Sequence, residues 1–397
     1  MSARASSVPR LRAEIEAEED ERLGPWALRS RESAGRLYPE DEPAHRTVFQ
    51  RDRDRIVHSK GFRRLEYKTQ VFVHHEGDHF RNRLTHTLEG AQIARTLARA
   101  LRLNEDLAEA VALAHDLGHT PFGHAGERVL AHAMKAEGGF DHNRQSLRVV
   151  DLLERRTPDH LGLNLTSETR EGMLKHGCHW SHPVAVPELG RQRPLESQVA
   201  DLADEIAYMN HDLDDALRGG LIDFEQAAEW PLIGESLQRV TETSGALARD
   251  LHRARAVSHT IDRLVIDATV HSAATLEAEA PDGPAAVRAA PRSWIAFSPP
   301  VFEQKRTLKR LLLEHVYHHP RVSQMTDLAE KVVEDLFGLY MREPGTLPEA
   351  VRARFGAEGM ARAVADHVAG MTDRFAVEQH RMLFGPEAVG PFGDLVR

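Results

Sequence analysis

The stretch AVALAHDLGHTPFGHAGERVL, residues 110–130, combines an apolar helical pattern with many groups that can bind a metal or move a proton. Its ionisable side chains of interest fall within thirteen positions: His115, Asp116, His119, His124 and Glu127. Burying such groups costs several kcal/mol each unless a partner or a metal ion compensates. The stretch therefore predicts a metal centre with general acid–base residues beside it.

Two other segments offer ligands of the same kind. The first contains His86, in RNRLTHTLEGAQIA, and the second is SQVADLADEIAYMNHDLDDAL, residues 197–217. In the second segment, polar residues recur at helical spacing close to one stripe: Asp201, Asp204, Tyr208 and Asp212. Its apolar residues lie mainly on the opposite side: Val199, Leu202, Ile206, Met209 and Leu213. When the opposite face of such a helix is apolar, its polar face is expected to be buried only if it lines a functional site.

Two histidines with two carboxylates form a mixed nitrogen and oxygen donor set. Such a set suits Mn²⁺, Mg²⁺, Fe²⁺, Co²⁺ or Ni²⁺, with positions left open for water and substrate. The chain has a single cysteine, which argues against a structural zinc site. From spacing alone, Asp201 and Asp204 both fit the second carboxylate position.

The order of these residues resembles the H…HD…D pattern of the HD-domain metal-dependent phosphohydrolases. Longer strings are similar to the deoxynucleoside triphosphate triphosphohydrolases, the dGTPase-like branch: FRRLEYKTQVF, RLTHTLEGAQIAR, AHDLGHTPFGHAGE and LADEIAYMNHDLDDA. The resemblance is strong over residues 20–225 and continues more weakly through LLLEHVYHHPRV, residues 311–322.

The resemblance implies a role for each matching position. The implied ligands of one divalent cation (Mn²⁺, Mg²⁺, Co²⁺ or Ni²⁺) are His86, His115, Asp116 and Asp204, and the D-xxx-Y-xxx-D spacing of this branch favours Asp204 over Asp201. His124 matches the catalytic histidine, and Glu127 matches the carboxylate that orients it. Contacts to the phosphates are implied for His119, His142 and Arg83. Tyr208 and Asp212 match residues that read the deoxyribose, and Gln70 matches a position beside the sugar and base.

The implied reaction is hydrolysis of a deoxynucleoside triphosphate (dNTP) to a deoxynucleoside and inorganic triphosphate. The resemblance also implies a homo-oligomer, a tetramer or hexamer, and dNTPs bound at separate sites as allosteric activators. One alternative is an HD hydrolase acting on another phosphate ester, such as a nucleoside monophosphate, but the sugar-reading pair Tyr208 and Asp212 argues against it. Another is a module that senses dNTPs or single-stranded DNA. Every ligand position is filled and aromatic residues make up only 6% of the chain, so base stacking is poorly supported.

Composition narrows the function classes further. The 397 residues carry a formal net charge of −10, with both signs spread along the chain, which argues against a general binder of nucleic acid or membrane surfaces. Cys178 has no partner for an internal disulfide, and no segment resembles a signal peptide or a membrane span. These features predict a cytoplasmic protein.

The elements that must position the site are helices, so the predicted fold is all-α with an HD-domain helical core. Asn104 suits the N-cap of a helix that ends before Gly118, which would place His115 and Asp116 in its last turn. The predicted divisions are an N-terminal arm (1–60) with one or two helices, the HD core (61–225) and a C-terminal helical region (226–397) that completes the fold and makes oligomer contacts. Residues 276–292, rich in Pro, Gly and Ala, are expected to form a loop, and KTQVFVHH (68–75) a short hairpin.

Three other polar clusters have simpler explanations. His74, His75 and His79 fit an exposed loop beside the pocket, and KHGCHWSH (175–182) fits a loop better than a zinc site. The basic stretch EQKRTLKRLLLEH (303–315) fits a solvated helix face, with contact to a second nucleotide or to a neighbouring subunit's phosphate as the alternative.

Overall fold

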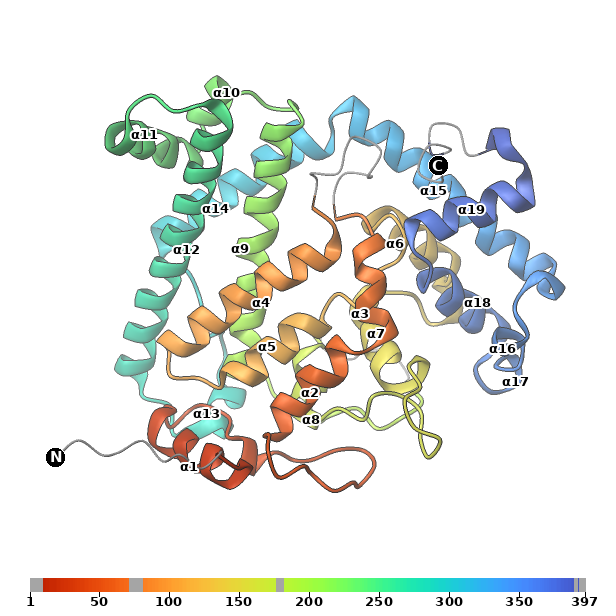
Figure 1. The fold of residues 1–397 in the computed structure, drawn as a ribbon, viewed down its shortest axis with the longest axis horizontal. Helices are drawn as coiled ribbons and strands as arrows, with labels where there is room; N and C mark the ends of the chain where they lie inside the picture. The colour runs from red at the N-terminus through yellow and green to blue at the C-terminus, as the bar shows by residue number, and fades with distance from the viewer. Residues whose placement is uncertain (1–9, 71–80, 176–181, 389–391, 393–397) are drawn as a thin grey trace.

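The computed structural model describes residues 10–70, 81–175, 182–388 and 392, and it confirms the all-α prediction (Figure 1). The helices of the first half are α1 (Arg12–Arg22), α2 (Val48–Val57), α3 (Lys60–Arg64), α4 (Arg83–Ala100), α5 (Glu105–Ala114), α6 (His124–Ala133), α7 (His142–Arg148), α8 (Ser167–Gly172) and α9 (Leu195–Arg218). Those of the second half are α10 (Phe224–Ala228), α11 (Ile233–Ser244), α12 (Arg249–Glu279), α13 (Gly283–Ala289), α14 (Pro299–Leu312), α15 (Pro320–Arg342), α16 (Glu349–Arg352), α17 (Phe355–Glu358), α18 (Met360–Ala369) and α19 (Asp373–Phe384).

In these described ranges the β-structure is limited to isolated bridges, one of which joins Thr69 to Asn82. Only residues 68–70 of the expected hairpin lie in the described part of the chain, and they form no strand. No described helix is long and apolar enough to cross a membrane.

Helices α4, α5 and α9 form the centre of the molecule, with α4 crossing α9 (Figure 1). The alanines of α5 are almost completely buried, so neighbouring helices approach its backbone closely. At the crossing of α4 and α9, a Cβ placed on Gly90 would lie 3.9 Å from that of Ala207. Small side chains thus set how near the two helices come, and these helices carry the predicted ligands.

The α5 helix begins as predicted but ends earlier. The Asn104 side chain accepts a hydrogen bond from the Leu107 backbone N–H, which confirms the N-cap. The helix ends at Ala114, so His115 and Asp116 lie in the turn that follows it and not in its last helical turn. Only glycine fits at position 118, because a Cβ there would lie 2.1 Å from the Ser146 backbone nitrogen of α7.

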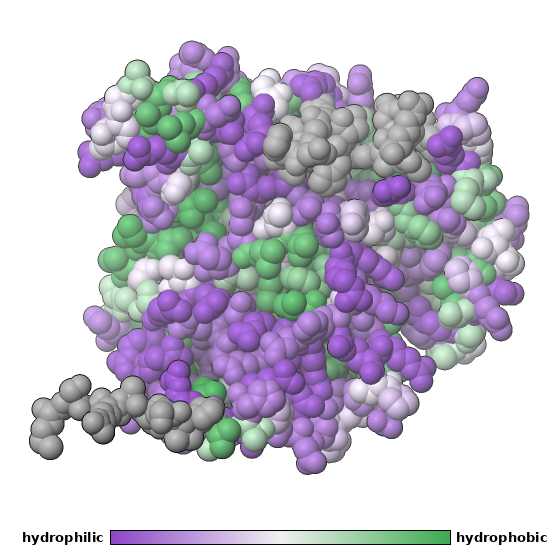
Figure 2. Space-filling view, in the orientation of Figure 1, coloured by the Kyte–Doolittle hydropathy of each residue, from purple (hydrophilic) through white to green (hydrophobic). Residues whose placement is uncertain are grey.

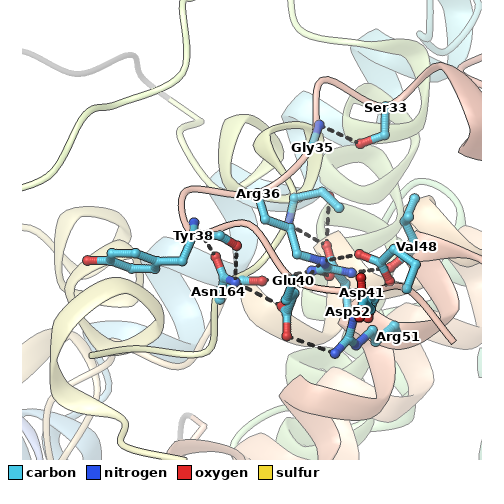
Figure 3. A network of polar contacts seen from close by, with 12 residues as sticks. Ser33, Gly35, Arg36, Tyr38, Glu40, Asp41, Val48, Arg51, Asp52 and Asn164 are labelled. Carbon is cyan, nitrogen blue, oxygen red and sulfur yellow. Dashed lines mark hydrogen bonds and ion pairs between the residues drawn. The ribbon is translucent and has the colours of Figure 1, made fainter. Parts of the chain in front are cut away.

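A buried ion pair within the N-terminal segment, together with the hydrogen bonds that its two residues make to the core, joins the segment to the core (Figure 3). The Arg36 guanidinium donates to the fully buried Asp52 carboxylate of α2 and, at 2.7 Å, to the Asn164 carbonyl. The second Asp52 oxygen accepts from the Thr166 backbone N–H at 2.8 Å, next to α8. Each buried charge thus has a partner, as burial requires. Residues 10–60 therefore pack closely on the core, while a domain boundary at residue 60 stays a prediction.

The loop predicted for residues 276–292 is wrong in most of its length. The α12 helix continues to Glu279, and α13 occupies Gly283–Ala289 with Val287 buried. The reason is that Pro284 stands in the first turn of α13, where the N–H that proline lacks would have no helical partner anyway. The alanines that follow then favour helix.

The remaining helices flank the centre on two sides (Figure 1). On one side, α14 packs against α9, where Lys305 is buried and pairs with Glu205 at 2.8 Å. The other basic residues of this stretch are exposed, which confirms the solvated face for Arg306, Lys309 and Arg310. On the other side, α15, α18, α19 and α6 share a second apolar core. Figure 2 shows hydrophobic residues gathered over the middle of the face where α4 and α5 lie, with hydrophilic residues over the N-terminal helices below.

Candidate metal and catalytic site

Three of the predicted ligands converge from three different helical segments. His86 lies in the first turn of α4, His115 caps the end of α5, and Asp204 is in the middle of α9. Both histidine Nε2 atoms point at the Asp204 Oδ1 atom, at 3.0 Å from His86 and 3.2 Å from His115. One donor atom from each residue lies within 4.8 Å of the others, so one ion could contact all three.

Asp116 lies beside this triad without joining its compact arrangement. One carboxylate oxygen is 3.0 Å from His115 Nε2, and the other accepts a hydrogen bond from Arg83 Nη1 at 2.9 Å. Asp201, the competing carboxylate of α9, forms an ion pair with Arg193. Geometry therefore favours Asp204 over Asp201 and leaves Asp116 shared between the triad and Arg83.

The donor set and its electrostatics fit a divalent cation. Burial lowers the pKa of His115, but the Asp116 and Asp204 carboxylates outweigh burial and raise it to about 10. The same negative field that would hold a proton on the ring attracts a cation. The His115 Nδ1 lies 2.6 Å from the Ala112 carbonyl, so this nitrogen carries the proton and Nε2 is left as a donor atom for a metal.

The predicted catalytic group lies immediately beside the triad. Glu127 of α6 bridges two imidazoles, with its oxygens 3.0 Å from His124 Nδ1 and 2.8 Å from His142 Nδ1. Burial raises the pKa of Glu127, but the hydrogen bonds from these two histidines outweigh it and hold the pKa far below its usual range. The carboxylate therefore stays ionised and orients both rings, while the His124 side chain is 58% exposed and open to a substrate.

His119 connects the catalytic group to the triad. Its Nε2 lies 3.2 Å from an Asp116 oxygen, and its ring stacks on His142 with centroids 4.1 Å apart. Burial, Arg83 and His142 all lower the pKa of His119, so its ring is neutral. Donor atoms of His119, Glu127 and His142 also fall within 4.8 Å of one another. Nearly parallel rings cannot both aim lone pairs at one ion between them, so this group fits a hydrogen-bonding role better than a second metal.

Tyr208 and Asp212 meet a partner that sequence reasoning missed. The Tyr317 hydroxyl donates to one Asp212 oxygen, and its ring stacks on that of Tyr208 with centroids 6.2 Å apart. The other Asp212 oxygen is buried without a hydrogen-bond partner in the described ranges. Burial raises the pKa of Asp212 to about 8. Tyr317 lies in a π-helical turn, Leu313–Tyr317, that continues α14, and π-turns often mark functional sites.

Arg83 and Gln70 complete the wall of the site. A Cβ placed on Gly123 would lie 2.9 Å from Arg83 Nη2 and 3.7 Å from the Gln70 carbonyl. The structure thus brings the Gln70 segment, the start of α4 and the loop before α6 together. The Gln70 side-chain oxygen is buried and has no partner among the described residues, so it is free to accept a hydrogen bond from a ligand.

Two further polar clusters predicted from the sequence lie wholly or mostly outside the described residues. His74, His75 and His79 lie outside the described residues, as do residues 176–181 of the histidine-rich 175–182 stretch. Of that stretch, Lys175 pairs with the second Asp204 oxygen at 2.5 Å, a contact that sequence reasoning missed, and His182 pairs with Asp151.

Comparison with known proteins identifies the family. The HD domain family model matches residues 83–209, and the phosphohydrolase-associated domain model matches residues 295–382. A deoxyguanosinetriphosphate triphosphohydrolase-like protein of Thiobacillus denitrificans is 50% identical over 380 residues, covering 92% of this chain and 98% of the relative. The chain belongs to this family of HD-domain phosphohydrolases.

Other members of the dGTPase-like family are similarly close. The proteins of that name from Ralstonia pickettii and Bordetella pertussis are 49% and 48% identical, covering 92% and 91% of this chain and 96% of each relative. The resemblance stated from the motifs is therefore confirmed, and the chain is a hydrolase. The HD domain match spans all four predicted metal ligands.

Proposed function

We propose that this dGTPase-like protein hydrolyses dNTPs to deoxynucleosides and inorganic triphosphate. The observation that carries the proposal is the convergence of His86, His115 and Asp204 next to the His124–Glu127 pair. A metal triad with an oriented imidazole beside it is the arrangement that hydrolysis of a phosphate ester needs.

The proposed metal ligands are His86, His115, Asp116 and Asp204, with Asp116 also held by Arg83. A divalent cation bound there supplies Lewis-acid stabilisation of charge on a phosphate oxygen. Mn²⁺, Mg²⁺, Co²⁺ and Ni²⁺ all suit these donors. The donor set does not distinguish between them.

The chain's own residues bind the triphosphate and move the proton. Arg83 offsets phosphate charge and lies within reach of the triad through Asp116. His119 and His142 present neighbouring imidazoles on the same side. His124, oriented by Glu127, exchanges a proton with the attacking water or the departing nucleoside oxygen.

The group formed by Tyr208, Tyr317 and Asp212 supports a deoxynucleotide substrate. The stacked rings of Tyr208 and Tyr317 form an apolar wall that would exclude a 2′-hydroxyl, and the free Asp212 oxygen can accept from a 3′-hydroxyl. The free Gln70 oxygen lies on the segment proposed to border the base. The relatives' names point to dGTP, and we propose it as one substrate among the dNTPs.

The deciding experiment is to incubate the purified protein with each dNTP and Mn²⁺ or Mg²⁺ and to identify the products. Inorganic triphosphate with the deoxynucleoside is the expected result. Pyrophosphate or single phosphates would show a different phosphate ester reaction. No product from any dNTP, including a mixture that supplies activators, would favour the sensing module.

Several predictions from the sequence belong to this proposal as well. They are a homo-oligomer (tetramer or hexamer), activation by dNTPs at a separate site, and a cytoplasmic location. Gel filtration tests the oligomer, and comparing the turnover of a single dNTP with that of a dNTP mixture tests the activation. Single-stranded DNA as a ligand has little support, because aromatic residues for base stacking make up only 6% of the chain.

A further inference from the structure

The metal ligand His86 has a second interaction on the far side of its ring. Its Nδ1 atom lies 3.1 Å from Nδ1 of His211, and the Nε2 atom of His211 lies 2.5 Å from a Glu89 oxygen. His86 and His211 are each 2% exposed. A continuous chain of polar groups thus runs from Glu89 through two imidazoles to the metal triad.

The chemistry of these groups fixes where the protons lie. An ionised carboxylate only accepts hydrogen bonds, so the His211 Nε2 facing Glu89 carries a proton. In a neutral His211 the Nδ1 atom is then an acceptor, and the His86 Nδ1 facing it carries the proton. With a cation bound at the triad, the remaining His86 nitrogen, Nε2, would present its lone pair to that cation instead of donating a proton to the Asp204 oxygen 3.0 Å away. Arg81 donates to the same Glu89 oxygen at 3.0 Å and keeps this carboxylate in place.

We propose that His211 and Glu89 are positioning residues that hold His86 in its metal-binding tautomer and orientation. The proposal rests on the proposed function, because it takes His86 as a metal ligand. Metal-binding histidines commonly donate their other N–H to a carboxylate, carbonyl or water. Here a second histidine relays that contact to the carboxylate.

The two histidine ligands therefore differ in how they are held. His115 donates to the backbone carbonyl of Ala112, which no substitution at that position removes. His86 depends on two side chains, one from α9 and one from its own helix α4. Side-chain substitutions can thus test the orientation of His86 without altering any ligand.

The test measures Mn²⁺ binding from the electron paramagnetic resonance signal of free Mn²⁺, so it does not depend on turnover. His211→Leu keeps the size of the side chain but offers His86 no acceptor, and the Mn²⁺ dissociation constant is expected to rise about 10–100-fold. His211→Asn places an amide oxygen where Nδ1 was, and it is expected to retain affinity within a few fold. If the tautomer of His86 does not affect binding, His211→Leu and His211→Asn will have the same Mn²⁺ dissociation constant.

Two further variants protect the test against misfolding. His259→Leu removes a histidine of α12 that bonds the Ser236 hydroxyl at 3.0 Å and is not among the triad's donors, and it is expected to leave Mn²⁺ binding unchanged. Glu89→Leu removes the carboxylate at the partly exposed end of this series of polar groups, and it is expected to weaken Mn²⁺ binding as His211→Leu does. It can therefore replace His211→Leu in the test if His211→Leu does not fold. Thermal unfolding without metal shows whether each variant is folded.

The outcomes separate this inference from the proposed function. If the wild-type protein binds no Mn²⁺, the metal site itself is wrong. If the wild-type protein binds Mn²⁺ and the folded Leu variants at 211 and 89 bind it equally well, the positioning role is wrong while the metal site stands.

Discussion

Asp373 and Thr69 lie 304 residues apart in the sequence, yet the Asp373 carboxylate accepts hydrogen bonds from both the backbone N–H and the hydroxyl of Thr69. The second Asp373 oxygen accepts from the Phe122 backbone N–H at 2.8 Å. One buried side chain at the start of α19 thus joins the segment that carries Gln70 to the loop that precedes His124. The C-terminal helices therefore help to shape the catalytic site.

Asp373→Asn tests this link. An amide nitrogen cannot accept a hydrogen bond, so one of the two connections is lost and a buried donor is left without a partner, at a cost of about 1–3 kcal/mol. We expect kcat with dNTPs to fall while the Mn²⁺ dissociation constant stays the same, because the triad is untouched. Steady-state kinetics and Mn²⁺ titration measure the two effects.

The neighbouring cap residue is the matched control for Asp373. Thr372→Ala removes the side chain that accepts from the Phe375 N–H, and it destabilises α19 by about 1 kcal/mol without touching either loop. If Thr372→Ala lowers kcat as much as Asp373→Asn does, the effect comes from the stability of α19 and not from the joined loops.

His124→Ala should remove turnover and spare metal binding. The imidazole is held by Glu127, is 58% exposed and is not among the clustered donor atoms of the triad, so its loss removes a proton-transfer group only. General acid–base groups contribute about 10²–10⁴-fold to a rate, and a loss of that size is expected in kcat. His132→Ala, on the exposed side of the same helix, should keep wild-type activity. Loss of Mn²⁺ binding in His124→Ala would instead place this residue among the ligands.

Asp204→Asn and Asp201→Asn decide between the two carboxylates of the α9 stripe. Asp204 Oδ1 is the atom that both ligand histidines face, so Asp204→Asn should abolish Mn²⁺ binding. Asp201→Asn weakens the pair with Arg193 and the longer pair with Lys175, 4.0 Å away, and should bind Mn²⁺ normally. Isothermal titration of both variants under the same conditions gives the comparison. Equal losses of Mn²⁺ affinity in the two variants would mean that Asp201 and Asp204 both contribute to metal binding.

The sequence was sufficient for the parts of the site that local rules determine. The α5 cap at Asn104 follows from hydrogen bonding within four residues, and the proposal of Asp204 as a ligand follows from a helical repeat combined with the spacing that the family resemblance implies. The last turn of α5 was misjudged, because the end of a helix depends on what packs there. At Gly118 the backbone of α7 comes so close that a Cβ would lie 2.1 Å from the Ser146 nitrogen, a long-range contact that local rules do not reveal.

The sequence does not identify the remaining residues of the site, because their contacts depend on how distant helices pack together. Tyr317 meets Asp212 across 105 residues, and its pairing depends on how α14 lies along α9. His211 stands directly beside Asp212 in the sequence, but its role depends on which face of α9 meets α4. Asp373 lies in a region whose motifs are weak. Periodicity identifies the helices that carry these residues and cannot identify their partners.

Glu196 makes a pH-dependent contribution to stability that can be isolated by a single substitution. This carboxyl lies in the first turn of α9 with no exposed surface, and one oxygen accepts from the Leu28 and Asn104 backbone N–H groups. The other oxygen has no partner in the described part of the chain. Burial raises the pKa of Glu196 to about 7, and the backbone hydrogen bonds offset this only in part.

The sign of the effect follows from the two pKa values. In the unfolded chain a glutamate has a pKa of about 4.3, so between there and pH 7 the folded protein binds more protons than the unfolded one. The free energy of unfolding therefore loses a contribution of about 3 kcal/mol as pH rises through this window. Glu196→Gln keeps a carbonyl acceptor and cannot ionise, so it should escape that loss.

Urea unfolding at pH 5 and pH 8, with a chelator present, measures this difference directly. The free energy of unfolding of Glu196→Gln minus that of the wild type should increase by about 3 kcal/mol from the lower to the higher pH. Glu242→Gln, at an exposed position of α11, sets how far such a substitution changes the pH dependence by itself. A constant difference between Glu196→Gln and the wild type across this range would mean that Glu196 ionises in the folded protein as it does in water, with the Leu28 and Asn104 donors fully compensating its burial.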